Sequence, residues 1–237
     1  SENTPSFTVS TERQIWKCFG CGVGGDVVRF LMETERIEFG EALRILAKRV
    51  GVKLVSYRSN DTEIEKEKIY QVNHLAAEFY HYLLTSHPVG QKALAYITGR
   101  GVSVKSIQLF KLGYAPNFSN WLQKFLIGKK GFRTEEMFKA GLLSSQTANP
   151  SDFFRDRLIF PLKDHRGNYV GFSGRTIGVW EAGKSFGPKY MNTPETRVYQ
   201  KGDLLYGLEA AKEAIKKQNR AVIVEGELDL ISSYEIG

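Results

Sequence analysis

Two cysteines, Cys18 and Cys21, constrain the fold of the N-terminal region more than any other feature of this sequence. Thiols three positions apart, with glycines at 20 and 22 that let the backbone turn closely around an ion, form half of a tetrahedral zinc site. The four histidines lie far downstream, so the other two ligands are not evident. Two free thiols and a redox dithiol are the alternatives, although a redox pair would normally open a helix directly after a strand.

Charge and composition divide the rest of the chain. The net charge is +7, and residues 69–201 hold eighteen Lys and Arg against eight Asp and Glu. A basic excess concentrated in one region favours a polyanionic partner. We predict a domain at residues 1–55, a polar linker at 56–68, a basic subdomain at 69–201 and a further segment at 202–237.

Hydrophobic periodicity predicts an α+β fold. Short strands are expected near residues 7–9 and 15–17, followed by a helix capped by Asp26. Further helices are predicted at 38–50, 69–85, 93–98, 104–110, 121–127, 134–140 and 205–217. Strands are predicted at 158–162, 169–173 and 175–177, and the apolar run at 221–224 is typical of a buried parallel strand. The pattern indicates a zinc-ribbon-like N-terminal sheet, a mixed α+β basic subdomain and the start of an α/β sheet.

Several cations stand beside glycines or aromatic residues in the basic subdomain. They are Arg100, Arg155, Arg157, Arg175, Lys189 and Lys201. Cations and aromatic rings on a surface rich in strands suit phosphates and stacked bases. Gly171 and Gly174 would let a polyanion approach the backbone closely. For any one of these cations taken alone, the alternative is a solvated surface side chain.

Acidic residues follow the predicted buried strand. Glu225 ends that strand, and Asp229 lies four residues further along. If a helix starts at Gly226, the two carboxylates face the same side and can approach one site. Clustered carboxylates bind Mg²⁺ or Mn²⁺, which can bridge substrate phosphates. Exposed carboxylates that hold no metal are the alternative.

Three stretches of the sequence resemble bacterial DNA primases of the DnaG type. Residues 1–54, with KCFGCG, resemble the N-terminal zinc-binding domain of that family. AYITGRGVSVKSIQLFKLGYAPN and residues 152–206, with GFSGR and KYMNTPET, are similar to the family's RNA-polymerase domain. AVIVEGELD resembles the opening of the TOPRIM module, although family members often carry a tyrosine where this chain has Glu227.

The resemblance implies a function and a set of site residues. It implies an enzyme that synthesises short RNA primers on single-stranded DNA from ribonucleoside triphosphates. The implied template and nucleotide contacts are Arg100, Arg175, Lys189, Asn192 and Lys201. Glu225 and Asp229 would be catalytic and hold Mg²⁺ or Mn²⁺, and Cys18 and Cys21 would bind a structural Zn²⁺. Arg155 and Arg157 would have supporting roles, paired with Asp152, Asp156 or Asp164.

The resemblance also sets expectations for the protein as a whole. In the family, two more zinc ligands precede the counterpart of Ser1, and further aspartates follow that of Gly237, so we expect this chain alone to be inactive. A replicative helicase would bind through a C-terminal domain outside this chain. No run of 18 apolar residues predicts a membrane span, and cysteine usage suggests a reducing compartment. The resemblance implies a cytoplasmic, replisome-associated location.

Two other functions fit some of these features. A non-catalytic module that binds single-stranded nucleic acid would share the basic subdomain but lack polymerase activity. A topoisomerase or nuclease would share the acidic motif, but those enzymes do not carry the GFSGR and KYMNTPET stretch.

Overall fold

The computed structural model describes residues 6–52, 61–145, 149–177 and 187–236. The chain forms two compact units, residues 1–59 and 60–237, and each is described by itself. Within the described residues, no helix combines the length and apolar character that crossing a membrane requires.

The N-terminal unit is a small antiparallel sheet followed by two helices. Strands β1 (Phe7–Ser10), β2 (Ile15–Cys18) and β3 (Gly24–Gly25) pair in the order β1-β2-β3, and helices α1 (Val27–Glu35) and α2 (Phe39–Arg49) follow. The Asp26 carboxylate accepts a hydrogen bond from the Arg29 N–H at 2.8 Å, which confirms the predicted helix cap. The Phe7, Trp16 and Phe30 rings pack within about 6 Å of one another and hold α1 against the sheet.

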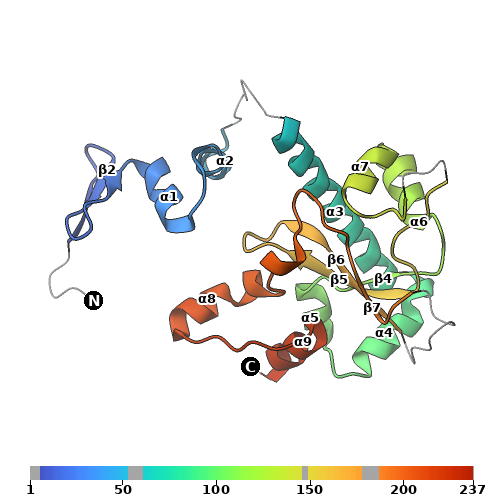
Figure 1. The fold of residues 1–237 in the computed structure, drawn as a ribbon. Coiled ribbons are helices and arrows are strands. Elements are labelled where there is room, and N and C mark those ends of the chain that lie inside the picture. The colour runs from blue at the N-terminus through green and yellow to red at the C-terminus, as the bar shows by residue number, and fades with distance from the viewer. Residues whose placement is uncertain (1–5, 53–60, 146–148, 178–186, 237) are drawn as a thin grey trace. The chain divides into compact units, whose positions relative to one another are not determined.

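The C-terminal unit contains a four-stranded antiparallel sheet surrounded by helices (Figure 1). The strands lie in the order β4-β5-β6-β7, and their bounds are β4 (Gly113–Ala115), β5 (Arg157–Lys163), β6 (Tyr169–Thr176) and β7 (Tyr190–Asn192). The helices are α3 (Asp61–Thr85), η1 (Pro88–Gly90), α4 (Gln91–Thr98), α5 (Val104–Leu109), α6 (Trp121–Gln123), the π-helix η2 (Lys124–Lys129), α7 (Thr134–Lys139), η3 (Lys201–Asp203), α8 (Leu208–Gln218) and α9 (Glu227–Ile236).

The long helix α3 covers one face of this sheet. Phe172 of β6 packs edge-on against Tyr80 of α3, with 5.7 Å between ring centroids. Ile159 of β5 and Phe154 complete this core with residues of α6, η2 and α7. Gly113 of β4 allows the contact, because a Cβ there would lie 2.5 Å from the Tyr80 Cβ and 2.8 Å from its carbonyl carbon. The backbones of α3 and β4 are therefore in close contact at this point.

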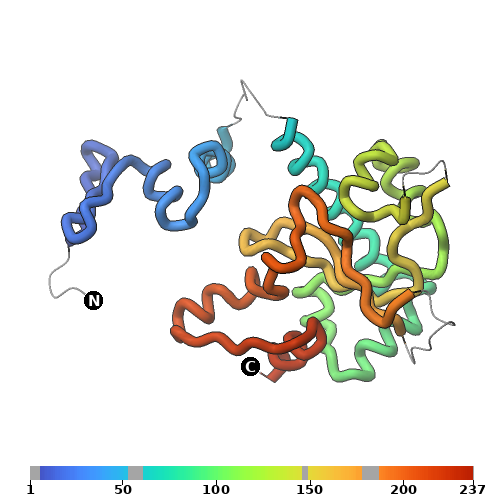
Figure 2. The backbone as a smooth tube through the Cα atoms, in the orientation of Figure 1, coloured from blue at the N-terminus to red at the C-terminus, as the bar shows by residue number. Residues whose placement is uncertain are grey.

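The opposite face of the sheet packs on α4, α5 and α9. Leu158 and Phe160 of β5 point to this side, where they join Ile97 of α4, Ile107 of α5 and Ile231 of α9. The last helix is also fixed by polar contacts, since the Glu235 carboxylate accepts a hydrogen bond from the Ser103 N–H at 2.7 Å. Figure 2 shows the segment between β7 and α8 passing over strands β5 and β6.

The α+β class and most of the predicted elements are present, with several differences. Helix α3 begins at Asp61, so the second part of the predicted linker at 56–68 is helical and its first part lies outside the described residues. The strands predicted at 169–173 and 175–177 form one continuous strand, β6. β4 and β7 were not predicted because three-residue strands carry too little periodicity.

The strand predicted at 221–224 is absent, which corrects the expectation of a buried parallel strand. These residues form no strand, and Val222 and Ile223 are 77% and 84% exposed. A parallel strand needs neighbours that supply its hydrogen bonds. The described residues pair no strand with this segment.

The contact between α3 and β4 predicts a steep cost for a small substitution. Gly113→Ala should lower the free energy of unfolding by about 1–3 kcal/mol, because the added methyl group meets the Tyr80 backbone. Gly128→Ala is the matched control, since a Cβ there meets nothing within 4 Å. Chemical denaturation of both variants measures the difference. Equal stability of the two variants would contradict this packing.

Candidate functional site

The pairing of β6 with β7 places the predicted basic residues. Arg175 lies opposite Tyr190, and Ser173 lies opposite Asn192. Directly opposed residues, and residues two apart on one strand, share a face of an antiparallel sheet. Arg175, Tyr190 and Asn192 therefore lie on one face. Arg175 is also opposite Leu158 of β5, so this is the face that packs on α4, α5 and α9.

Arg175 is a buried cation with few partners. Its residue is only 6% exposed. One guanidinium Nη donates a hydrogen bond to the Tyr96 hydroxyl of α4, and the guanidinium carbon lies 5.4 Å from the Tyr96 ring centroid and 5.7 Å from that of Tyr190. Its Nε has no hydrogen-bond partner among the described residues, and the same holds for the buried hydroxyl of Ser173 on this face. Burying a charge without an anion costs several kcal/mol, so the arrangement favours an anionic ligand.

Arg100 joins Arg175 at Tyr96. Arg100 follows the end of α4 and is exposed, and its guanidinium carbon lies 5.3 Å from the Tyr96 ring centroid. One tyrosine ring thus contacts two arginines that are 75 residues apart in the chain. Two cations gathered on one ring would repel each other unless an anion or water screened them.

Arg157 lies on the opposite face and has a different role. It is 1% exposed, and its Nη1 donates to the carbonyls of Gly174 at 3.3 Å and Lys189 at 3.4 Å. Burial lowers the pKa of this guanidinium, and the nearby Asp156 carboxylate opposes that shift. The Lys189 carbonyl also accepts the Thr176 N–H at 3.0 Å. Arg157 therefore fixes the backbone of Lys189, which stands exposed just before β7.

Two of the three aspartates expected to pair with Arg155 or Arg157, Asp152 and Asp164, accept other hydrogen bonds. The Asp152 carboxylate accepts hydrogen bonds from the N–H groups of Leu122 and Gln123, at 2.8 and 3.2 Å, and so caps α6. Burial raises the pKa of Asp152 to about 6, against the opposing effect of these hydrogen bonds. Asp164 holds the β5–β6 turn by accepting the Arg166 and Asn168 N–H groups.

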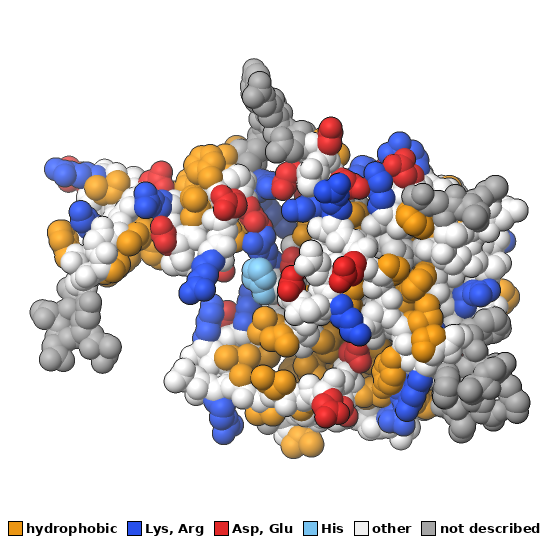
Figure 3. Space-filling view, viewed as in Figure 1, with side chains coloured by type: hydrophobic (Ala, Val, Ile, Leu, Met, Phe, Trp, Pro, Cys, Tyr) orange, Lys and Arg blue, Asp and Glu red, His pale blue; other side chains and the backbone are white. Residues whose placement is uncertain are grey.

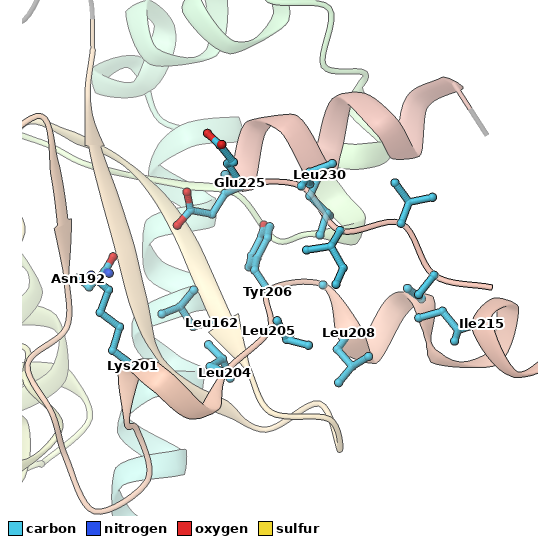
Figure 4. A pocket seen from close by; sticks show the side chains of 18 of the residues that line it. Leu162, Asn192, Lys201, Leu204, Leu205, Tyr206, Leu208, Ile215, Glu225 and Leu230 are labelled. Carbon is cyan, nitrogen blue, oxygen red and sulfur yellow. The ribbon is translucent and has the colours of Figure 1, made fainter. Parts of the chain in front are cut away.

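A cavity of about 550 Å³ opens beside this face (Figure 4). Asn192 and Lys201 lie on one side of its polar end, Glu225 lies on the other, and the Tyr206 ring stands between them. Burial raises the pKa of the Tyr206 phenol well above its ordinary value, and the Glu227 and Glu209 carboxylates raise it further. Two residues of the predicted template and nucleotide site, Asn192 and Lys201, and one predicted catalytic acid, Glu225, thus line a single cavity.

The other end of the cavity is apolar. It is lined by Leu205, Leu208, Ile215, Val222 and Ile223. Figure 3 shows hydrophobic side chains gathered over α8 and α9 where the surface is hollowed. The exposed run at 221–224 therefore forms a wall of the cavity that carries Glu225.

The acidic motif is only partly assembled. Helix α9 begins at Glu227, and the Gly226 carbonyl accepts the Leu230 N–H at 3.0 Å. Glu225 and Glu227 line the cavity, whereas Asp229 is not among the described residues that line it. No group of three or more His, Cys, Asp or Glu side chains suited to a metal occurs in the described parts of the chain. Two carboxylates beside this cavity nevertheless provide the oxygen donors that Mg²⁺ prefers.

The cysteine pair forms a tight turn in the N-terminal unit. The Gly22 N–H donates to the Cys18 carbonyl at 2.9 Å, and the Ser6 hydroxyl lies 3.7 Å from the Cys18 sulfur. A hydrogen bond from the Cys21 backbone, and then the Ser6 hydroxyl, lower the pKa of the Cys18 thiol. A pair of thiols on one turn, with N–H groups that favour ionisation of Cys18, fits half of a tetrahedral zinc site.

Sequence reasoning missed Tyr96, Ser173 and Tyr206. Tyr96 stands four residues before Arg100, a spacing that places two residues on one side of a helix, so its contact with Arg100 had a signal. The contact between Tyr96 and Arg175 had none, because it depends on how α4 packs on the sheet.

Two family models match the chain. The family described as DNA primase catalytic core, N-terminal domain, matches residues 79–212, and the CHC2 zinc finger family matches residues 1–62. A DNA primase of Geobacillus stearothermophilus is 42% identical over all of this chain, which covers 40% of that relative. The chain thus spans about 40% of the length of the curated relatives that it matches.

Solved structures agree with these matches. The Aquifex aeolicus primase, comprising zinc-binding and RNA-polymerase domains, is 39% identical with a TM-score of 0.62, over 98% of this chain and 54% of that one. A DnaG primase catalytic domain bound to ssDNA is 33% identical with a TM-score of 0.60, over 70% of this chain and 50% of that one.

The two buried arginines should respond oppositely to the same substitution. Arg175→Met should leave stability unchanged or raise it by up to about 2 kcal/mol, because it removes a buried charge that has no carboxylate partner in the described structure. Arg157→Met should cost about 2 kcal/mol, because the Gly174 and Lys189 carbonyls lose a donor. Thermal and chemical unfolding measure both variants. An equal loss of stability in both would show that Arg175 is an ordinary structural residue.

Proposed function

The chain belongs to the DNA primase family, and from this premise we propose that the protein containing it synthesises short RNA primers on single-stranded DNA. The observation that carries the proposal is the buried Arg175, whose Nε is unpartnered in the described structure and which lies on the same sheet face as Asn192. A buried cation with free donor capacity is suited to a phosphate. The relative solved with bound ssDNA supports a nucleic-acid ligand for this fold.

The basic residues divide between template and nucleotide in this proposal. Arg100 and Arg175, which share the Tyr96 ring, would hold phosphates of the template strand. Asn192 and Lys201 line the cavity that also contains Glu225, so they would contact the incoming ribonucleoside triphosphate. Lys189 would act with them, since Arg157 fixes its backbone immediately before β7. Fixed cations near a transferring phosphoryl group stabilise the charge that develops on it.

Magnesium or manganese would bind at the edge of the cavity, between Glu225 on its wall and the first turn of α9, where Asp229 lies outside the cavity lining in the described structure. Glu225 and Asp229 would hold the ion, as oxygen donors of the kind these cations select. When bound, the ion would lower the charge barrier to attack of a 3′-hydroxyl on the α-phosphate. Tyr206, kept neutral by its raised pKa, can donate a hydrogen bond into the same space without adding charge.

The N-terminal unit would contribute a structural zinc site. The CHC2 zinc finger match over residues 1–62 supports zinc there. Cys18 and Cys21 would supply two of its ligands, and their shared turn fits that role. A structural zinc would stabilise a unit whose sheet, in its described part, consists of three short strands.

The protein's partners and location follow from the same function. A replicative helicase would recruit the enzyme through a domain outside this chain. The enzyme would then act at replication forks in the cytoplasm.

Primer synthesis by the full-length protein tests the proposal. With Mg²⁺, ribonucleotides and single-stranded DNA, the unmodified protein should make short RNA, and Asp229→Asn should reduce synthesis by about 100-fold or more, because a metal ligand is lost. Glu213→Gln is the control, since Glu213 is exposed and pairs only with Lys216 in the described structure.

Two results would contradict the proposal in different ways. Undiminished synthesis by Asp229→Asn would remove Asp229 from the metal site. DNA binding without any synthesis by the unmodified protein would favour a non-catalytic module that binds single-stranded nucleic acid.

A further inference from the structure

Tyr96 occupies a position between the two arginines assigned to the template. It lies in the last turn of α4, is half-buried, and its hydroxyl accepts the hydrogen bond from the Arg175 guanidinium. Its ring centroid lies 5.3 Å from the Arg100 guanidinium carbon and 5.4 Å from that of Arg175. No other described residue makes a ring contact with both arginines.

The chemistry of the phenol matters because it is neutral. A carboxylate at this position would also orient Arg175, but it would neutralise the charge that a phosphate must meet. A tyrosine hydroxyl accepts one hydrogen bond and its ring attracts the guanidinium, and neither contact adds a full negative charge. The Arg175 Nε keeps its donor capacity, since no described residue uses it.

The packing of α4 does not depend on Tyr96. The helix is anchored in the core by Ala93 and Ile97, both with 0% exposure, together with the partly buried Leu94. Tyr96 is outside the described hydrophobic clusters. The main described contacts of the Tyr96 side chain are with the two arginines.

We propose that Tyr96 is a positioning residue, which holds the Arg175 and Arg100 guanidinium groups in the direction of nucleic-acid phosphates without neutralising them. The proposal rests on the proposed function, because it takes single-stranded DNA as the ligand of these arginines. The Tyr190 ring, directly opposite on β7, also lies near Arg175, with its centroid 5.7 Å from the guanidinium carbon.

Binding of a labelled single-stranded oligonucleotide by the chain carrying Tyr96→Phe tests the proposal. The substitution removes one hydroxyl and keeps the ring. Affinity should fall about threefold to tenfold, the range that corresponds to the net strength of one ordinary hydrogen bond. Tyr82→Phe, an exposed tyrosine on α3, is the matched control and should bind as the unmodified chain does.

A double-mutant cycle separates positioning from a general structural effect. In a chain that already carries Arg175→Met, Tyr96→Phe should cause little further loss, because the group that it positions is gone. Tyr96→Glu should weaken binding more than Tyr96→Phe and raise thermal stability, because it supplies the neutralising carboxylate. The slope of log affinity against log salt should fall by about one in Tyr96→Glu, as one phosphate contact is lost.

The outcomes are distinct. Unchanged binding by Tyr96→Phe, or an equal loss with and without Arg175, would overturn the positioning role while leaving the proposed function intact. Failure of the unmodified chain to bind the oligonucleotide would overturn this inference, because single-stranded DNA would not be the ligand of these arginines, whereas primer synthesis by the full-length protein tests the proposed function separately.

Discussion

The close approach of α3 to the four-stranded sheet is the constraint on which the C-terminal unit depends. At Gly113 the strand backbone meets the Tyr80 backbone with no room for a methyl group, and Phe172 then packs on the Tyr80 ring. This contact assigns one face of the sheet to the core beneath α3. The other face, with Arg175, is thereby turned toward α4 and α9, and the strand alternation fixes which side chains can reach a ligand.

The buried arginines on the two faces of the sheet have different hydrogen-bond partners. Arg157, on the α3 side, gives its hydrogen bonds to backbone carbonyls and so contributes to the structure. Arg175, on the other side, donates to a tyrosine hydroxyl, and its Nε has no partner among the described residues. A buried cation without an anionic partner lowers the stability of the free protein, and it is stabilised when a phosphate binds. The cavity with Asn192, Lys201 and Glu225 adjoins the same face, so the proposed template and nucleotide contacts would lie on one sheet.

The sequence was sufficient for the local structure and insufficient for the assembly of the site. Asp26 as a helix cap and the paired strands around the cysteines follow from short-range patterns, and both are present. The strand at 221–224 was predicted from an apolar run, yet strand formation depends on neighbours that no local pattern specifies. The link between Tyr96 and Arg175 joins residues 79 positions apart and depends on helix packing, so residue types alone could not reveal it.

The central claim is that Arg175 is kept unneutralised for a phosphate, and ¹⁵N NMR of its guanidinium tests this most directly. In the free protein the Arg175 Nε–H should exchange slowly with solvent because the group is buried. Titration with single-stranded DNA should shift this resonance and leave that of Arg157 in place. An Arg175 resonance that does not respond, while the DNA binds, would show that the phosphates lie elsewhere and would contradict the account.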